Sequence, residues 1–308
     1  SWCDSTFNPW RGCQKISAGC ASCYADTMSK RNPKTLGVWG PNGTRVLASE
    51  TMWRQPLKWD KDADKAGTRP RVFCASLADV FEEWPGAMLN HKGEQLYHGW
   101  HHAQPDWVAS STPCEGEPVT MADVRARLFA LIDATPHLDW LLLTKRPENI
   151  LRMINLIRLD GGSTGRIREF DIDTPAHPYF RRNVWLGTSV ENQEYADKRI
   201  PELLKCRDLA PVLFLSCEPL LGPVELAYPE ALYPDGPQMC CSGFECGCHG
   251  RPCEPPAYLN SAFGGVDWVI VGCESGPNRR ETKLEWIRDL RDQCQAAGVA
   301  FFVKQLEI

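Results

Sequence analysis

Six short runs of apolar residues recur along the 308-residue chain, and they limit its possible folds more than any other feature. Each run is continuous rather than alternating, which is typical of strands buried on both faces of a sheet. Patterns with helical spacing lie between several of the runs. Strands that alternate with helices predict an α/β fold with a parallel sheet and right-handed crossovers. The runs are RVFCAS (71–76), DWLLLT (139–144), NVWLGTS (183–189), PVLFLS (211–216), DWVIVG (267–272) and VAFFV (299–303).

Two helices can be predicted in detail. One spans residues 120 to about 134, and the other spans residues 282–297. In the second, Thr282 and Glu285 have the spacing of a capping box, and Gly298 is a typical helix stop. Each helix has an apolar side suited to packing on the sheet: Val124, Leu128, Leu131 and Ile132 in the first, and Leu284, Ile287, Leu290 and Cys294 in the second.

Six or seven strand–helix units predict a partial (β/α)6 TIM-like barrel, formed by residues 1–308 as a single domain. A doubly wound open sheet is the alternative. In both folds the functional residues lie at the C-terminal ends of the strands. Three segments interrupt the pattern, and we expect them to be insertions over the barrel mouth: residues 85–118, 159–182 and 228–265.

Polar residues gather where the predicted strands end. One polar residue after a strand means little, but six groups at matching positions are better explained by a shared pocket. The groups are Ser76, Asp79 and Glu82; Thr144, Lys145 and Arg146; Ser189, Glu191 and Asn192; Ser216 and Glu218; Glu274, Ser275, Arg279 and Arg280; and Lys304 and Gln305.

The composition argues against a broad nucleic-acid-binding face, a membrane span and an exported protein. Hydrophobic residues make up 43% of the chain and the net charge is -5, which favours a sizeable core and leaves room only for a local basic patch. No apolar run approaches the roughly 18 residues of a membrane span, and no secretory segment opens the chain. We therefore expect a cytoplasmic protein, in which the clustered cysteines bind metal or carry out redox chemistry.

The most concentrated cysteines are Cys13, Cys20 and Cys23, in the stretch GCQKISAGCASCYA. A structural zinc usually takes four ligands, so three local thiolates leave one position open unless Cys3 folds back to fill it. A [4Fe–4S] cluster held by three thiolates instead keeps its fourth iron free for a small-molecule ligand. The triad thus favours an iron–sulfur cluster, with zinc and plain thiols as alternatives.

Seven segments, in the same order, carry a resemblance that covers nearly the whole chain. Together they resemble a phage-associated radical S-adenosylmethionine (SAM) family, whose cysteine loop follows the first strand of a partial (β/α)6 barrel. Two features depart from the usual family pattern. The first cysteine spacer is longer than usual (CX6CX2C), and Ser22 stands before Cys23 where an aromatic residue is usual, with Tyr24 following instead. The segments are NPWRGCQKISAGCASCYA, RVFCASLADVFE, LLLTKRPENI, NVWLGTSVENQ, LSCEPLLGPV, DWVIVGCESGP and FFVKQ.

The resemblance implies a cofactor and a set of contacts. Cys13, Cys20 and Cys23 would hold a [4Fe–4S] cluster, and SAM would chelate its free iron. One electron would then cleave SAM to methionine and a 5′-deoxyadenosyl radical, which takes a hydrogen atom from the substrate. Helix capping and ion pairing are the ordinary alternative roles for strand-end acids. The implied SAM contacts are Tyr24, Ser76, Asp79, Ser189, Glu191, Ser216, Glu218 and Glu274.

Within that family the chain is most similar to glycinyl-thymidine isomerases of phage DNA hypermodification. The implied reaction converts N-glycinyl-thymidine to Cα-glycinyl-thymidine, in DNA or as a nucleotide in the host-cell cytoplasm, with a reducing electron donor. Cations could hold a substrate carboxylate or phosphate, or serve only solubility. The candidates are Lys145, Arg146, Arg279 and Arg280.

A base in duplex DNA would have to leave the stack to reach a buried radical. Aromatic residues in and beside the first insertion could hold that base, or could pack as a lid: Trp84, Tyr97, Trp100 and Trp107. The acidic net charge keeps a free nucleotide or a short single strand open as substrates.

A second cysteine group, CCSGFECGCHGRPC, lies in the third insertion. It could bind zinc, bind an auxiliary cluster or remain as free thiols, and zinc is favoured. Its members are Cys240, Cys241, Cys246, Cys248, His249 and Cys253. The remaining cysteines mostly follow apolar patterns and are expected to be packing residues: Cys3, Cys74, Cys206, Cys217, Cys273 and Cys294.

Two other classes of function stay open. One is a radical SAM enzyme that acts on another nucleic-acid or nucleotide substrate, which the identity of the product would reveal. The other is a non-enzymatic iron–sulfur or zinc protein that binds nucleic acid. Such a protein would not cleave SAM and would tolerate loss of the strand-end acids.

Overall fold

The computed structural model describes residues 1–98, 116–159, 181–226, 265–276 and 279–306. These residues form a seven-stranded parallel sheet with the strand order β1-β4-β6-β7-β8-β9-β10. Each of the six predicted apolar runs overlaps one of the strands. The strands are β1 (Ser5–Thr6), β4 (Arg71–Cys74), β6 (Asp139–Thr144), β7 (Val184–Ser189), β8 (Val212–Cys217), β9 (Trp268–Gly272) and β10 (Ala300–Gln305).

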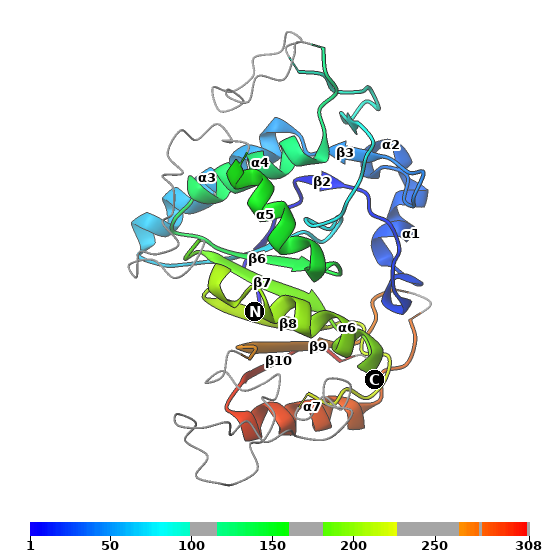
Figure 1. Ribbon diagram of the computed structural model, residues 1–308, viewed down its shortest axis with the longest axis vertical. Coiled ribbons are helices and arrows are strands. Elements are labelled where there is room, and N and C mark those ends of the chain that lie inside the picture. The colour runs from blue at the N-terminus through cyan, green and yellow to red at the C-terminus, as the bar shows by residue number, and fades with distance from the viewer. Residues whose placement is uncertain (99–115, 160–180, 227–264, 277–278, 307–308) are drawn as a thin grey trace, which may run out of the picture.

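The order of the strands in the sheet follows their order in the chain, and every neighbouring pair is parallel. A doubly wound sheet reverses its strand order at a switch point, so that alternative is wrong. The sheet curls into an open half-barrel (Figure 1), with β1 and β10 as its two edges within the described residues. The structure thus confirms the α/β class and a barrel-like winding.

Helices α3 to α7 pack on the outer side of the half-barrel, whereas α1 and α2 lie beside the C-terminal ends of its strands (Figure 1). Helix α4 confirms the first predicted helix, because Thr120 and Asp123 form a reciprocal capping box and the predicted apolar side is buried. The helices are α1 (Tyr24–Arg31), α2 (Pro33–Leu36), α3 (Glu50–Ala66), α4 (Met121–Asp133), α5 (Ile150–Leu159), α6 (Gln193–Leu204) and α7 (Leu284–Ala297), with 3-10 turns η1 (Ala18–Cys20), η2 (Pro147–Asn149) and η3 (Arg207–Leu209).

The start of helix α7 corrects one prediction. The helix begins at Leu284, and its N-cap residue Lys283 makes no side-chain cap. The Thr282 hydroxyl instead donates to the carbonyl of Leu220, at 2.9 Å, so the predicted capping box with Glu285 is wrong. The predicted stop is confirmed, since Gly298 has a φ of 69° and closes the helix in a left-handed conformation.

A small second sheet lies beside the half-barrel and was not predicted. Its strands β2 (Trp10–Arg11), β3 (Arg45–Leu47) and β5 (Met88–Leu89) have the order β2-β3-β5. Strand β5 and an isolated bridge between Tyr97 and Pro118 belong to the predicted insertion 85–118. Half of that insertion, and almost all of 159–182 and 228–265, lie outside the described residues, so their place over the barrel mouth stays a prediction.

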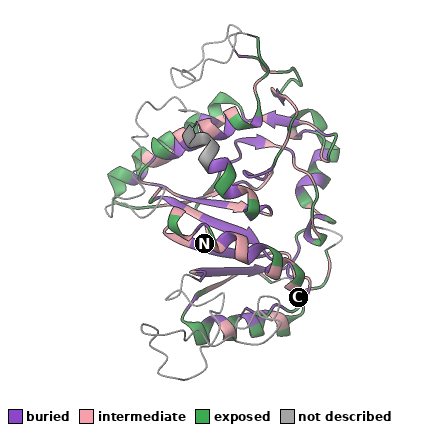
Figure 2. Cartoon of the chain, in the orientation of Figure 1, coloured by how far each residue is buried: buried purple, intermediate pink, exposed green. Residues whose placement is uncertain are grey.

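Both faces of the inner strands β7, β8 and β9 are buried, as their continuous apolar runs predict (Figure 2), whereas no residue of the edge strand β10 is buried. The larger core fills the space between sheet and helices. A smaller cluster of Leu141, Phe214, Trp268 and Ile270 fills the concave side, and Phe73 packs against it. Within the described residues no helix is long and apolar enough to cross a membrane.

Candidate functional site

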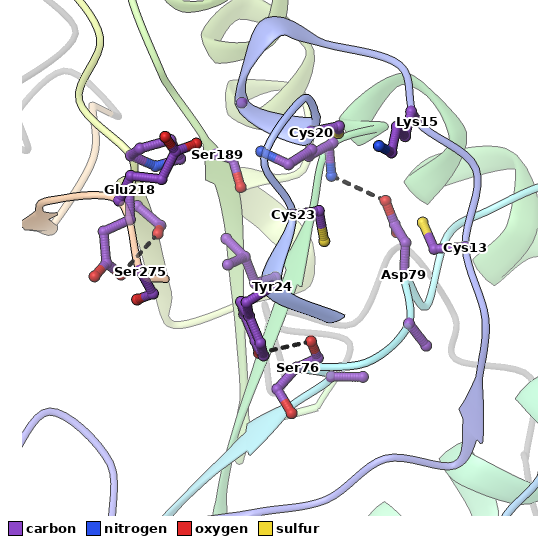
Figure 3. Close-up of a pocket in the computed structure, with 18 of the residues that line it drawn as sticks. Cys13, Lys15, Cys20, Cys23, Tyr24, Ser76, Asp79, Ser189, Glu218 and Ser275 are labelled. Atoms are coloured by element: carbon purple, nitrogen blue, oxygen red, sulfur yellow. Dashed lines mark hydrogen bonds between the residues drawn. The ribbon is translucent and has the colours of Figure 1, made fainter. Parts of the chain in front are cut away.

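A cavity of about 200 Å³ lies at the C-terminal ends of the parallel strands (Figure 3). One water needs roughly 10–15 Å³ measured in this way, so the cavity has room for far more than a single ion. The predicted strand-end groups and the cysteine triad meet here. The lining includes Cys13, Cys20, Cys23, Tyr24, Trp39, Phe73, Ser76, Asp79, Lys145, Ser189, Ser216, Glu218, Glu274, Ser275 and Lys304.

The three cysteines come from one loop that joins strand β2 to helix α1. Cys13 follows Gly12, whose φ of 113° turns the chain where a side chain would meet the carbonyl of Thr44. Cys20 ends the 3-10 turn η1, and Cys23 is the N-cap residue of α1. We call residues 13–23 the cysteine loop. Its local folding brings all three thiols to one side of the same cavity.

The cysteine loop is fastened at its start by two strand-end residues. The backbone N–H of Gln14 donates to Glu82 Oε1 at 2.7 Å, and Arg146 donates to the carbonyl of Gln14 at 3.0 Å. Arg146 also lies 3.9 Å from the sulfur of Cys13. Glu82 in turn is held by the buried Arg45 through two contacts of 2.7 and 2.8 Å.

The middle of the cysteine loop rests on the buried carboxylate of Glu191. The Ser17 hydroxyl donates to Glu191 Oε1 at 2.7 Å, and Lys145 pairs with the same oxygen. Arg199 donates to Oε2 at 2.8 Å. Burial alone would raise the pKa of Glu191, but the two cations outweigh it and lower that pKa, so the carboxylate is charged.

The surroundings of the three thiols shift their pKa values in different directions. Burial opposes the thiolate of Cys20, but the nearby Lys145 ammonium and hydrogen bonds outweigh it and lower the pKa of that thiol. Burial raises the pKa of Cys13 well above its ordinary value, and the carboxylate of Glu82 adds to the effect. Burial also raises the pKa of Cys23. Cys20 is therefore the most easily deprotonated of the three.

A metal group in this cavity would have cysteine thiols as its ligands. Within the described residues, no three His, Cys, Asp or Glu side chains converge as ligands of one metal ion. Three thiols do line one cavity, and a cubane spreads its thiolate ligands over separate irons rather than gathering them on one. Cys13, Cys20 and Cys23 are the residues that could hold such a group.

Asp79 lines the cavity, but its carboxylate is already engaged. It accepts from the Thr144 hydroxyl at 2.6 Å, from the backbone N–H of Lys145 at 3.1 Å and from Arg146 at 2.8 Å. Asp79 thereby ties the loop after β4 to the end of β6. The Arg146 guanidinium is therefore paired within the protein, and the Arg146 side chain is only 9% exposed.

A family model described as a protein of unknown function (DUF5131) matches residues 1–91 and 98–307. The chain belongs to the DUF5131 family. No curated protein and no solved structure matches it. Because the matched ranges include all the strands of the half-barrel, the family extends over the cysteine loop and the cavity of this DUF5131 protein.

Most of the predicted site residues of this DUF5131 chain lie together, and four do not. Arg146 and Glu191 form hydrogen bonds with the cysteine loop and do not line the cavity. Arg280 pairs with Glu274 and donates to the carbonyl of Ala18 at 3.0 Å, so it also holds this loop. Arg279 is exposed and does not line the cavity. Lys145 is the one predicted substrate cation that does.

Other predicted residues have varied outcomes. The buried positions of Cys74, Cys206, Cys217 and Cys294 confirm that they pack in the core, whereas Cys273 is buried but also lines the cavity and Cys3 is half-buried. Trp84 does not stand free as a base-holding residue, because its ring packs 4.4 Å from the guanidinium of Arg45. The second cysteine group, with Trp100 and Trp107, lies outside the described residues.

Sequence reasoning missed several residues that shape the site. Trp39 lines the cavity from the loop before β3, in a Gly-rich turn that carries no signal of a ligand site. Ser17 and Arg45 hold the cysteine loop, directly and through Glu82. Lys304 belongs to a predicted strand-end group, but nothing in its position along the chain marks it as a partner of Glu218.

Proposed function

We propose that this protein is a radical SAM enzyme in which Cys13, Cys20 and Cys23 hold a [4Fe–4S] cluster and SAM occupies the adjoining cavity. One observation carries the proposal: three thiols from a single loop line the same cavity as polar residues from six strand ends. The C-terminal ends of parallel strands are where barrel enzymes place their chemistry.

The residues around the cysteine loop would keep such a group in a fixed place. Glu82 and Arg146 hold the loop at Gln14, and Glu191 holds it at Ser17. When bound, the cluster supplies the electron that cleaves SAM. Lys145 favours the anionic form of Cys20, which is the form that binds iron.

The strand-end residues that line the cavity would contact SAM. Tyr24 donates to the carbonyl of Ser76 at 2.8 Å, so helix α1 and the loop after β4 close together beside Cys23. Ser76, Ser189 and Ser216 present hydroxyl groups that can donate or accept. Asp79 and Glu191 are better suited to a structural role, because their carboxylate oxygens already accept hydrogen bonds from other protein groups.

We further propose, on the resemblance of the seven segments, that the substrate is N-glycinyl-thymidine and that the product is its Cα-linked isomer. Hydrogen abstraction at the glycine Cα would give a radical stabilised by the adjacent nitrogen and carboxylate. Cleavage of the methylene C–N bond and formation of a C–C bond would leave a radical on the nitrogen. Return of the hydrogen atom from 5′-deoxyadenosine to that nitrogen would complete the rearrangement with the same atoms. A reducing partner would supply the electron, and the second cysteine group would bind zinc.

The decisive experiment is anaerobic reconstitution with iron and sulfide, followed by addition of dithionite and SAM and detection of 5′-deoxyadenosine by mass spectrometry. We expect the wild type to form it and the Cys20→Ala variant not to. Cys206→Ala is the matched control, because Cys206 is buried outside the cavity and should leave product formation unchanged.

Two results would overturn the proposal. Stoichiometric zinc without sulfide at the triad would make it a structural site. A full cluster that cleaves no SAM, even with N-glycinyl-thymidine present, would favour a non-enzymatic iron–sulfur protein. If 5′-deoxyadenosine forms but the thymidine is unchanged, the radical SAM assignment holds and the substrate is another nucleic acid or nucleotide.

A further inference from the structure

Two side chains of opposite charge stand together in the cavity wall. Lys304, on β10, places its Nζ 3.2 Å from Glu218 Oε1 and 3.4 Å from Oε2. Both residues line the cavity. Figure 3 shows Glu218 across the cavity from Cys13 and Asp79. The pair thus faces the same space as the cysteine loop, from the other side.

Residues of two neighbouring strands surround the carboxylate of Glu218. A Cβ atom at Gly272 would lie 2.5 Å from Glu218 Oε1, so a side chain there would displace the carboxylate from its present position. The hydroxyl of Ser216 lies 3.2 Å from Oε2 and donates to it. Neighbouring strands β8 and β9 therefore fix this acid at the cavity wall, unlike a carboxylate on a solvated surface.

The pair keeps unused hydrogen-bonding capacity. An ammonium has three donors, and a carboxylate has about four acceptor positions. Within the described ranges, Glu218 is the only hydrogen-bond acceptor that Lys304 reaches, and its other contact is the ring of Trp2 at 4.9 Å. The Lys304 to Glu218 distances also exceed the roughly 2.7–2.9 Å of a tight charge-assisted hydrogen bond. Both groups can therefore take a further charged partner.

We propose that Glu218 and Lys304 bind an amino-acid-like zwitterion, with its carboxylate on Lys304 and its ammonium on Glu218. The inference rests on the proposed function and identifies the part of the substrate that this wall recognises. The glycine unit of N-glycinyl-thymidine carries both charges. The methionine unit of SAM carries the same two charges, but a SAM molecule bound to a cluster on the three cysteines would have that unit beside the cysteine loop. The location across the cavity therefore assigns the pair to the substrate.

The test compares two probes by calorimetry with the full chain prepared anaerobically. One probe is the N-glycinyl-thymidine nucleoside, and the other is its primary amide, which keeps the amine but lacks the carboxylate charge. Lys304→Met should weaken binding of the acid about tenfold and leave the amide within about twofold. Glu218→Gln should weaken both probes alike. The control Lys198→Met, on an exposed pair with Glu194, should change neither.

A charge-swapped variant, Glu218→Lys with Lys304→Glu, keeps an ion pair if either single variant folds poorly. It should also lose the preference for the acid. Weaker binding of SAM with unchanged binding of the nucleoside would assign the pair to methionine and overturn the inference. Unchanged binding of both ligands, or no binding of the nucleoside to the wild type, would also overturn it. The two proposals can also fail separately. If the wild type binds the acid more tightly than the amide through Lys304 but forms no 5′-deoxyadenosine, the proposed function is refuted and the binding role of the pair stands.

Discussion

Gly19 of the cysteine loop packs directly on the buried carboxylate of Glu191, a residue that follows strand β7. A Cβ atom at Gly19 would lie 2.5 Å from both Cγ and Oε1 of Glu191. Glu191 is completely buried, so it cannot move away into solvent. The absence of a side chain at one position thus lets the loop that carries Cys20 settle onto the barrel edge.

This contact predicts the result of adding a single methyl group. Gly19→Ala should push the cysteine loop off Glu191 and reduce bound iron and sulfide several-fold, while the half-barrel stays folded. Iron and sulfide analysis after anaerobic reconstitution measures the first effect, and thermal unfolding measures the second. Gly222→Ala is the matched control, because its Cβ would meet only Asn192 at an ordinary 3.5 Å. Equal iron in both variants would contradict the prediction.

The charge on Glu191 should make stability depend on pH. Lys145 and Arg199 lower its pKa despite burial, so the folded state holds the proton less strongly than the unfolded chain does. Its contribution is therefore fully present above the unfolded value, near 4.5, and is lost as pH falls through the lower folded pKa. Glu191→Gln should cost about 3 kcal/mol at pH 7, because it leaves buried cations unpaired.

The measurement is urea unfolding of the wild type and Glu191→Gln from pH 7 to the lowest pH at which both fold. The difference in unfolding free energy should be constant down to about pH 5 and then shrink. Glu194→Gln is the control, since solvent screens its exposed pair with Lys198 and the substitution should leave stability nearly unchanged. A difference that stays constant at acid pH would show that Glu191 acts by its shape rather than its charge.

The sequence predicts the sheet and the location of the site for one physical reason. Strands such as β8 are buried on both faces, which requires a continuous apolar run, and the ends of parallel strands meet at one edge. Ser76, Ser189 and Ser216 therefore share a cavity although they are distant in sequence. The two-residue strands β2 and β5 are too short to leave any periodic signal.

The roles of individual charges could not be predicted in the same way. Arg146 and Glu191 stand at strand ends like the other candidates, but they turn toward the cysteine loop. Their partners Gln14 and Ser17 lie more than a hundred residues away in sequence, and only the folded geometry brings them together. Likewise, Thr282 has the spacing of a helix cap, yet a carbonyl from the loop after β8 takes its hydroxyl.

The fully buried pair of Arg45 and Glu82 should support both stability and the cysteine loop. Two contacts of 2.7 and 2.8 Å join them, and Glu82 also accepts from the N–H of Gln14. Arg45→Met should cost about 3–5 kcal/mol, because it leaves a buried carboxylate uncompensated. Arg45→Lys should recover only part of that loss, since an ammonium cannot make the same two-pronged contact.

Chemical unfolding of both Arg45 variants, with bound iron as a second readout, tests this. The control is Lys205→Met, which removes an exposed pair with Glu202 and should change stability by less than about 1 kcal/mol. Full recovery by Arg45→Lys would show that charge alone is needed. If the variants lose stability but bind as much iron as the wild type, Glu82 is not needed to hold the cysteine loop in place.

Within the described part of the chain, Trp39 lines the cavity and carries an unpaired indole donor. Its indole Nε1 is buried and has no hydrogen-bond partner among the described residues, although buried donors are normally paired. Trp39→Phe removes that donor. Because no described residue of the free protein pairs with the donor, its loss should not lower the free energy of unfolding, but SAM should bind several-fold more weakly. Trp53→Phe is the control, because its Nε1 is equally unpartnered but Trp53 does not line the cavity. Calorimetric titration of SAM into both variants measures the difference, and equal affinities would mean that the bound ligand does not use the Trp39 donor.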